Sequence, residues 1–202
     1  MELSPDHRLK GDALGIDTYT RNYTLEWECW IYNMPHTYFQ LFYHLVWSTK
    51  NRVLSIPPLF EERLHGYIGG AFKTKGCLPI AIGGMPDHVH VWIAIPPTYV
   101  ISEVVRNIKV ATTKWVRETN PHCFDFAWQE GYGAFSVSVS NKNAVINYIK
   151  NQKEHHKGRS FKDEFLILLK QHEIEHDEKY LWKWHSWFSN TLIRECIVII
   201  II

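Results

Sequence analysis

The sequence lacks an excess of charge of either sign. Its 22 basic and 21 acidic residues leave a formal net charge of +1, so the overall balance gives no sign of a nucleic-acid partner. That is weak evidence against such a partner, because binding depends on the local distribution of charge. Internal repeats and low-complexity stretches are also missing. A chain of 202 residues suits one compact domain with terminal extensions.

Cysteine is sparse, and membrane or export signals are missing. The spacing of the cysteines, with no CxxC pair, favours a reduced, cytoplasmic protein over a disulfide framework or a zinc site. Residues 1–30 contain acids and bases and no apolar core of a signal peptide. The apolar run at 197–202 has six residues, whereas a membrane span needs about 20. The run is therefore expected to be an apolar tail that adheres to other apolar surfaces, rather than a membrane anchor. The four cysteines are Cys29, Cys77, Cys123 and Cys196.

Tryptophan, by contrast, is abundant, and the apolar pattern is clear. The nine Trp residues can pack in a core or offer flat surfaces to unstacked bases, and packing is the ordinary role. Apolar periodicity predicts an element order of β-α-β-β-α-β followed by further helices. The strands are expected at 37–47, 78–85, 88–95 and around 126–137, and the helices from 59 to Gly76, from Ser102 to Asn120, from Ser140-Asn141 to Gly158, and at 163–169.

This order is that of the ferredoxin-like fold in the α+β class. It forms an antiparallel sheet with helices on one face, and here a C-terminal helix is added. The fold says little about function, because many unrelated activities use it.

His88 and His90 form the first candidate site. Residues two apart on a strand project from the same face, so the two imidazoles stand side by side, while Val89 and Val91 face the core. Paired imidazoles on one strand can share a metal ion. An HxH pair also arises by chance, so the pair alone is a weak signal.

Tyr148 and Gln152 form the second candidate site. Four residues apart on a helix, they share a face. A Tyr on an apolar helix stripe is usually a core residue with its hydroxyl at the edge, and a Gln is usually solvated. Residues 153–159 add a local basic cluster suited to phosphate contacts, which is equally typical of a solvated helix end.

Four segments together resemble one known family. They are YHLVWSTKNR at 43–52, PDHVH at 86–90, FAWQEGYGAFS at 126–136 and YIKNQKEHH at 148–156. In this order they resemble the single-tyrosine HUH transposases of small bacterial insertion sequences that move as single-stranded DNA, the insertion-sequence-200-like family. The resemblance spans residues 34–182 and is far more specific than any single motif.

The resemblance implies an active site. The family's metal ligands fall on His88, His90 and Gln152, and its nucleophile falls on Tyr148. A divalent cation polarises the scissile phosphate; Mg²⁺ prefers oxygen ligands and Mn²⁺ accepts imidazole, so either is compatible. The resemblance also implies a 5′-phosphotyrosine intermediate, which keeps the energy of the broken bond for rejoining. The sequence does not identify a base for the tyrosine, whose usual pKa is near 10.

The resemblance also implies partners. Family members act on single-stranded DNA with imperfect hairpin ends, and as homodimers in which the tyrosine helix can complete the partner's active site. For backbone contacts with DNA we predict Lys50, Arg52 and Lys109. Family members commonly begin near Met34, so residues 1–33 are expected to be an N-terminal extension, and the apolar tail at 183–202 matches nothing in the family.

Three alternatives stay open at this point. A histidine-triad nucleotide hydrolase would share the start of the HVHV alternation, but Trp92 stands where its nucleophilic histidine is required. A plain RNA-binding ferredoxin-like module would stack bases on its sheet. A domesticated relative would bind nucleic-acid hairpins as a regulator and never transpose.

Overall fold

The chain divides into two units, residues 1–39 and 40–202. A computed structural model describes residues 38–182, and all that follows concerns that part of the second unit. The predicted extension at 1–33 and the predicted tail at 183–202 lie outside the described residues, so both stay predictions. Within the described part, no helix combines the length and apolar character needed to cross a membrane.

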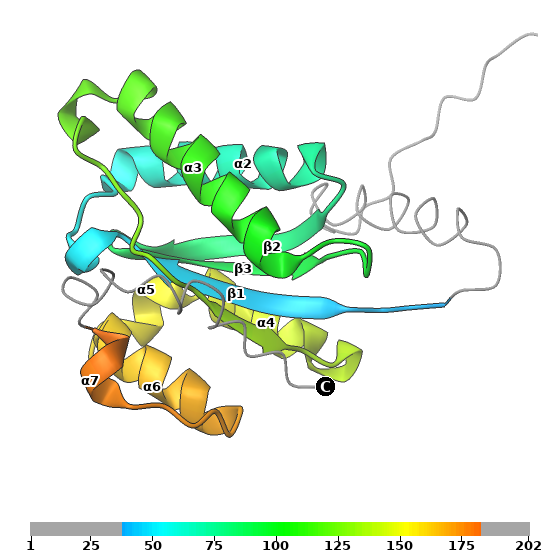
Figure 1. Ribbon diagram of the computed structural model, residues 1–202. Helices are drawn as coiled ribbons and strands as arrows, with labels where there is room; N and C mark the ends of the chain where they lie inside the picture. Colours follow the sequence, from blue (N-terminus) through cyan, green and yellow to red (C-terminus); the bar gives the residue numbers. More distant parts are fainter. Residues whose placement is uncertain (1–37, 183–202) are drawn as a thin grey trace, which may run out of the picture. The chain divides into compact units, whose positions relative to one another are not determined.

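The predicted element order is confirmed. Two helices alternate with the strands, and the helices expected after the fourth strand are present (Figure 1). One-turn 3₁₀ helices occupy Lys50–Arg52, Pro121–Cys123 and Val139–Asn141. The main elements are β1 (Phe42–Ser48), α2 (Pro58–Thr74), β2 (Leu78–Met85), β3 (His88–Ala94), α3 (Ile101–Thr119), β4 (Gly133–Ser136), α4 (Lys142–Lys150), α5 (Gln152–His155), α6 (Phe161–Gln171) and α7 (Glu178–Leu181).

The four strands form one antiparallel sheet in the order β2-β3-β1-β4. This is the ferredoxin-like arrangement that the sequence predicted. Helices α2 and α3 cover one face, and α4, α5 and α6 lie on the other (Figure 1). Because β3 lies between β2 and β1, the HxH pair lies on a central strand, at its start, where His90 is opposite Val46 and His88 is opposite Ser48.

The core is split by the sheet into two clusters. The larger one, under α2 and α3, contains Val89, Val91 and Ile93 of β3, and the smaller one, under α6, contains Val46 and Phe135. Trp47 and Trp92 are fully buried, so they have the packing role expected for tryptophan. The two cysteines in the described range, Cys77 and Cys123, are buried free thiols.

Local chemistry explains where the helices begin and end. Pro58 stands in the first turn of α2, where its missing N–H is not needed, and Gly76 follows the helix with φ +69°, a conformation that favours glycine. Ser160 and Asp163 form a reciprocal capping box at the start of α6. These sequence signals fix the ends of α2 and the start of α6.

Two predicted strands were too long. The first strand begins at Phe42 rather than at residue 37. The fourth strand is confined to Gly133–Ser136, because Gly131 turns the chain with φ +74° and the preceding segment makes only an isolated bridge between Trp128 and Thr49.

The helix expected from Ser140-Asn141 to Gly158 is divided. It breaks at Asn151, whose φ of −100° and ψ of 22° end α4, and Gln152 opens the short helix α5. Asn141 occupies the N-cap position of α4, but its side chain makes no capping hydrogen bond.

Candidate active site

The HxH pair projects from β3 toward α4, α5 and α6. Both imidazoles are fully buried, and their ring centroids lie 5.0 Å apart. Val89 and Val91 face the opposite core, as the alternation of a strand predicted. The sheet therefore supplies two buried, neighbouring imidazoles.

The Nδ1 atom of each of these two histidines has a hydrogen-bond partner. Asp87 Oδ1 accepts a hydrogen bond of 2.6 Å from His88 Nδ1, and His44 Nε2 lies 2.9 Å from His90 Nδ1. Burial lowers the pKa of His90 to about 4 and that of His44 well below its usual value. This pair is therefore neutral, and the tautomer in which His90 Nδ1 donates to His44 is the one that leaves a lone pair on His90 Nε2.

His88 is held in a more acidic environment. Burial lowers its pKa, but the hydrogen bond and charge of Asp87, together with the nearby carboxylate of Glu164, outweigh burial and raise it. The Nε2 atoms of His88 and His90 are both buried without a hydrogen-bond partner. Two carboxylates thus favour a positive charge at His88 Nε2, which a proton or a metal ion can supply.

Tyr148 and Gln152 face the same histidines from α4 and α5. The Tyr148 ring centroid lies 5.8 Å from that of His90 and 6.1 Å from that of His44. Gln152, usually a solvated residue, is only 1% exposed, and its Oε1 is buried without a partner. The structure therefore brings together all four residues predicted for metal binding and catalysis, within one chain.

Glu164 of α6 lies at the centre of this cluster and was not predicted. Its side chain is 2% exposed. Oε1 accepts hydrogen bonds from the Tyr148 hydroxyl and, at 3.1 Å, from Gln152 Nε2, while Oε2 lies 2.8 Å from His156 Nε2. The signal that could have revealed it is an acid on the apolar stripe of α6, between Phe161 and Leu168.

The charge of Glu164 affects its neighbours. Burial alone would raise the pKa of Glu164, but the hydrogen bond with His156 and the close imidazoles of His88 and His90 hold it far below its usual range. Burial, followed by the charge of Glu164, raises the pKa of Tyr148 well above 10. Tyr148 is consequently a neutral phenol in the metal-free chain, and it needs a positive charge nearby to act as a nucleophile.

A comparison with protein-family models shows which family the chain belongs to. The model of the family described as "Transposase IS200 like" matches residues 37–152, more than half of the chain. The chain belongs to the IS200-like transposase family. The matched segment includes His88, His90, Tyr148 and Gln152, whereas Glu164 lies beyond it.

Individual proteins are also similar to this IS200-like transposase. The ISDra2 transposase TnpA of Deinococcus radiodurans is 25% identical over 119 residues, which cover 56% of this chain and 85% of the relative. The crystal structure of a putative transposase from Deinococcus radiodurans R1 is 26% identical with a TM-score of 0.50, covering 59% of this chain and 96% of that chain. A REP-associated tyrosine transposase bound to a REP hairpin is 16% identical with a TM-score of 0.46, covering 62% and 74%.

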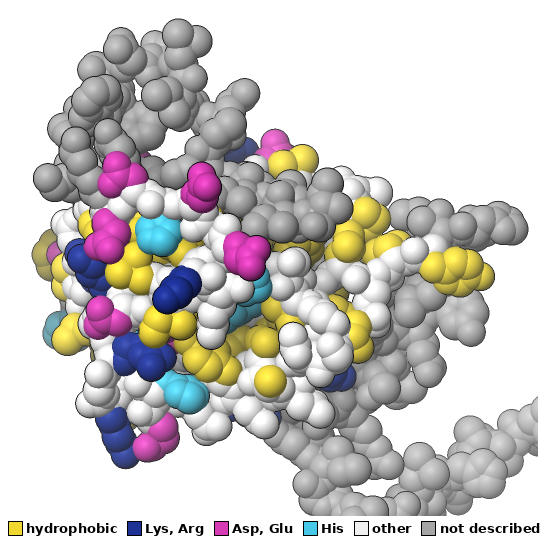
Figure 2. Space-filling model, turned by 90° about the horizontal axis from the view of Figure 1, so that it is seen from below, with side chains coloured by type: hydrophobic (Ala, Val, Ile, Leu, Met, Phe, Trp, Pro, Cys, Tyr) yellow, Lys and Arg dark blue, Asp and Glu magenta, His cyan; other side chains and the backbone are white. Residues whose placement is uncertain are grey.

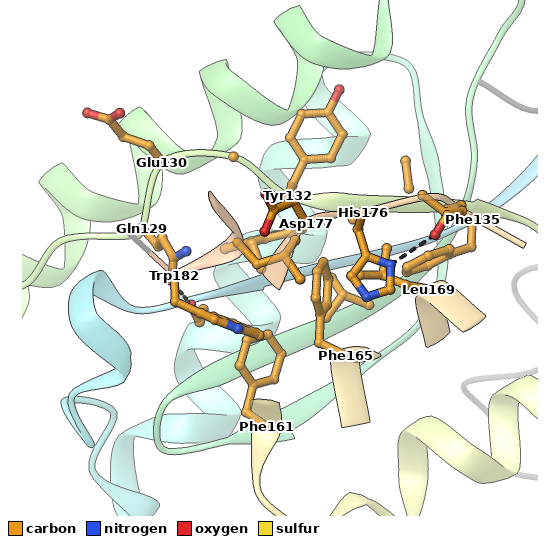
Figure 3. A pocket seen from close by; sticks show the side chains of 18 of the residues that line it. Gln129, Glu130, Tyr132, Phe135, Phe161, Phe165, Leu169, His176, Asp177 and Trp182 are labelled. Atoms are coloured by element: carbon orange, nitrogen blue, oxygen red, sulfur yellow. Dashed lines mark hydrogen bonds between the residues drawn. The ribbon is translucent and has the colours of Figure 1, made fainter. Parts of the chain in front are cut away.

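An apolar pocket of about 300 Å³ adjoins the active site of the transposase. The rings of Phe135, Phe161, Phe165 and Trp182 surround it (Figure 3). Phe161 also stacks on His88 with ring centroids 4.5 Å apart, so one side chain forms a wall of the pocket and supports a proposed metal ligand.

The three basic residues predicted to contact DNA have different surroundings. Lys50 is exposed, and the Arg52 guanidinium lies 4.9 Å from the centre of the Trp182 ring. The Lys109 ammonium donates to the carbonyl oxygens of Gln129, at 2.8 Å, and Gly131, and burial lowers its pKa to about 7. Lys109 therefore holds the loop before β4, and its predicted DNA contact stays a prediction.

The surface over α4 and α6 carries no continuous basic patch among the described residues. Figure 2 shows this face with basic, acidic and histidine side chains interspersed with apolar ones. This pattern agrees with the net charge of +1.

Proposed function

We propose that this transposase cleaves and rejoins single-stranded DNA through a covalent 5′-phosphotyrosine at Tyr148, with a divalent metal ion held by His88, His90 and Gln152. One observation carries the proposal. The nucleophile and the three proposed ligands face one another in a single buried site, although they come from three elements separated in sequence.

The donor atoms of the three ligands fit a metal ion. His88 Nε2, His90 Nε2 and Gln152 Oε1 are all buried without a hydrogen-bond partner. Such atoms are costly to bury, and nitrogen and oxygen donors of this kind suit Mn²⁺ and Mg²⁺. When bound, the ion would polarise the scissile phosphate and offset the charge that develops on it.

Tyr148 supplies the covalent chemistry. Its hydroxyl oxygen attacks the phosphorus, and the bond from phosphorus to the 3′ oxygen breaks. The tyrosine proton passes to the Glu164 oxygen that accepts its hydrogen bond, and the departing 3′ oxygen takes up a proton to become a hydroxyl. The energy of the broken bond is kept in the phosphotyrosine, so rejoining to another 3′-hydroxyl requires no nucleotide cofactor.

The proposed partners follow from the family. We assign the substrate as single-stranded DNA with hairpin ends, with Lys50 and Arg52 close to its phosphates, and the functional assembly as a homodimer. Tyr148 lies beside the histidines of its own chain, which supports active sites completed within each subunit rather than across the dimer.

The main alternative is a hairpin-binding regulator that does not transpose. The complete set of His88, His90, Tyr148 and Gln152 in one site favours the enzyme. A base-stacking RNA module is less compatible with this fold, because helices cover both faces of the sheet (Figure 1). A histidine-triad hydrolase is disfavoured because the residue in the required position, Trp92, is fully buried.

The test is to incubate the full chain with single-stranded oligonucleotides carrying the hairpin ends of its element, with Mn²⁺ or Mg²⁺. We expect an adduct that survives denaturation, absent with EDTA and in Tyr148→Phe, and present in the control Tyr99→Phe, whose side chain is 43% exposed. If Tyr148→Phe forms the same adduct, the nucleophile is wrong. Hairpin binding without cleavage by the wild type would support the regulator.

A further inference from the structure

Glu164 is a buried carboxylate whose ion pairs are all with histidines. Its contacts with His88, His90 and His156 are 3.4, 3.3 and 2.8 Å long. A buried carboxylate costs several kcal/mol unless a positive charge compensates it. The contact with His156 is a hydrogen bond, but the two longer contacts require another explanation.

The contacts with His88 and His90 have the geometry of neighbouring ligands rather than of hydrogen bonds. Glu164 Oε2 approaches the Nε2 atoms of both residues, yet neither nitrogen has a hydrogen-bond partner. Two ligand atoms that are each about 2.1 Å from a cation, at angles between octahedral and tetrahedral, lie roughly 3.0–3.4 Å apart. Both measured distances fit this spacing.

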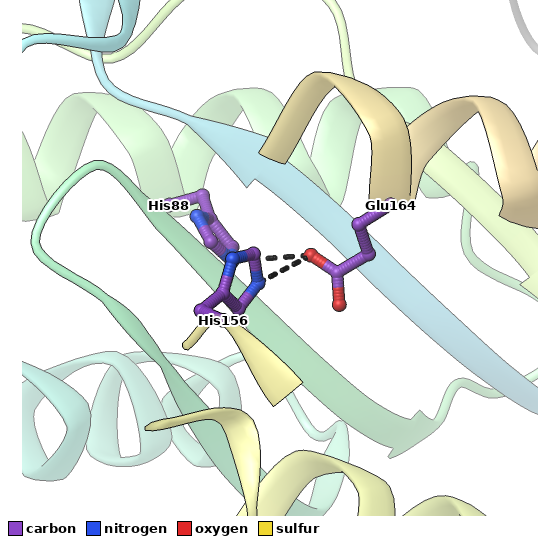
Figure 4. Close-up of side chains that lie close together, drawn as sticks. All are labelled: His88, His156 and Glu164. Carbon is purple, nitrogen blue, oxygen red and sulfur yellow. Dashed lines mark hydrogen bonds and ion pairs between the residues drawn. The ribbon is translucent and has the colours of Figure 1, made fainter. Parts of the chain in front are cut away.

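His156 holds the carboxylate in this position. Its Nδ1 lies 2.8 Å from the carbonyl oxygen of Arg159, and its Nε2 lies 2.8 Å from Glu164 Oε2, so the ring is held between the two oxygens. Figure 4 shows the imidazoles of His156 and His88 on the same side of the carboxylate, and their ligand atoms and that of Glu164 all lie within 4.8 Å of one another.

We infer that Glu164 is a ligand of the metal ion, adding a carboxylate from α6 to the set formed by His88, His90 and Gln152. This inference rests on the proposed function. It also extends the site beyond the segment matched by the family model, which ends at residue 152. The helix α6, begun by its capping box, is then part of the catalytic machinery.

The added carboxylate has two consequences. Its negative charge and hard oxygen favour Mn²⁺ and Mg²⁺ over softer metals. It also joins the metal site to the nucleophile, because the other oxygen of Glu164 accepts the hydrogen bond from Tyr148. Glu164 thus fixes the phenol beside the ion while one of its oxygens binds that ion.

The experiment measures Mn²⁺ binding to the full chain without DNA, by the loss of the free Mn²⁺ signal in electron paramagnetic resonance. In Glu164→Gln we expect the affinity to fall at least about 100-fold, since altering even outer-shell partners costs about 10–100-fold. In Glu164→Asp the Mn²⁺ affinity should fall about tenfold, because the carboxylate is retained but its side chain is one methylene group shorter. Glu173→Gln, the same exchange at an exposed position just after α6, should bind as the wild type does.

Thermal unfolding in EDTA separates a ligand effect from a folding defect. Glu164→Gln should unfold cooperatively, because a neutral side chain of equal size replaces a buried charge, and Mn²⁺ should raise its unfolding temperature far less than that of the wild type. If Glu164→Gln fails to fold, Glu164→Asp is compared with the wild type in its place.

The outcomes for this inference and for the proposed function are distinct. If folded Glu164→Gln binds Mn²⁺ with wild-type affinity, the assignment of Glu164 as a ligand is overturned. If Glu164→Gln does not fold, wild-type affinity in Glu164→Asp overturns it instead. If His90→Ala abolishes binding in the same experiment, the metal site of the proposed function stands. If the wild type itself binds no Mn²⁺, the proposed metal site fails together with the inference.

Discussion

Gly83 of β2 lies directly against the carbonyl oxygen of Ile149, the residue after Tyr148. A Cβ atom placed on Gly83 would be 2.4 Å from that oxygen and 2.9 Å from the Ile149 side chain. Gly83 also pairs with His90 across the sheet. The absence of a side chain at this position thus allows the tyrosine helix to approach the strand that carries the histidines.

Replacing Gly83 with alanine should displace α4 and reduce DNA cleavage. The obstructing atom belongs to the backbone, so the helix as a whole must shift, and a misplacement of about 1 Å can cost about 100-fold in rate. The control is Gly70→Ala in α2, where an added Cβ meets nothing within 4 Å. Cleavage rates of the two variants with saturating Mn²⁺ check this; equal rates would show that the close approach is unimportant.

His44 should control the affinity of the site for metal through His90. In His44→Phe the ring is kept but the acceptor for His90 Nδ1 is lost, so the lone pair on His90 Nε2 is no longer enforced. We expect Mn²⁺ affinity to fall by about 10–100-fold. His44→Gln offers an acceptor oxygen at similar reach and should recover part of the loss. A titration in which both variants behave alike would assign His44 to packing only.

His65 of α2 should make the fold sensitive to acid. Burial, followed by the charge of Lys153, lowers its pKa from 6.5 to about 4. The unfolded chain therefore binds a proton at higher pH than the folded chain does, so stability is complete above pH 6.5 and decreases as the pH falls toward 4. At about 1.4 kcal/mol per pKa unit the loss is about 3 kcal/mol.

Urea unfolding at pH 7 and pH 4 checks this dependence. His65→Gln should lose less stability between the two values than the wild type, by up to about 3 kcal/mol. The difference between the two proteins isolates His65 from the other groups that titrate in the same range. An equal loss in both proteins would contradict the assignment.

Mixing two inactive variants should not restore cleavage. Tyr148 faces His90 of its own chain, so a mixed dimer of Tyr148→Phe and His90→Ala contains no complete site if each site belongs to one subunit. A site shared across the dimer would contain one intact set and regain activity. Co-expression of the two variants with different affinity tags, followed by cleavage assays on the isolated mixed dimer, distinguishes the two arrangements.

Local periodicity in the sequence was enough to predict which residues of one strand or helix share a face. Alternation along β3 placed His88 and His90 on one face, and helical spacing kept Tyr148 near Gln152 despite the break at Asn151. Both patterns depend only on neighbours along the chain. The order of the elements followed from the same periodicity, and the resemblance of four segments linked them to one family.

What the sequence could not predict depends on long-range packing. Glu164 and His44 join the site only because α6 folds back under the sheet and β1 pairs with β3 in one particular register. Each is a polar residue in an apolar stretch, which marks a buried polar group but not its partner. The loop before β4 likewise depends on a tertiary contact, since Lys109 of α3 binds the carbonyl oxygen of Gln129 in that loop.

The most direct test of the central claim is to locate the covalent bond. The full chain is incubated with Mn²⁺ and a single-stranded element end labelled at its 3′ terminus, then denatured and digested with trypsin. We predict that the label stays on the peptide of residues 143–150, with a mass increase that maps to Tyr148. A label on another peptide, or release of the labelled strand with a free 5′ phosphate and no adduct, would contradict a 5′-phosphotyrosine at Tyr148.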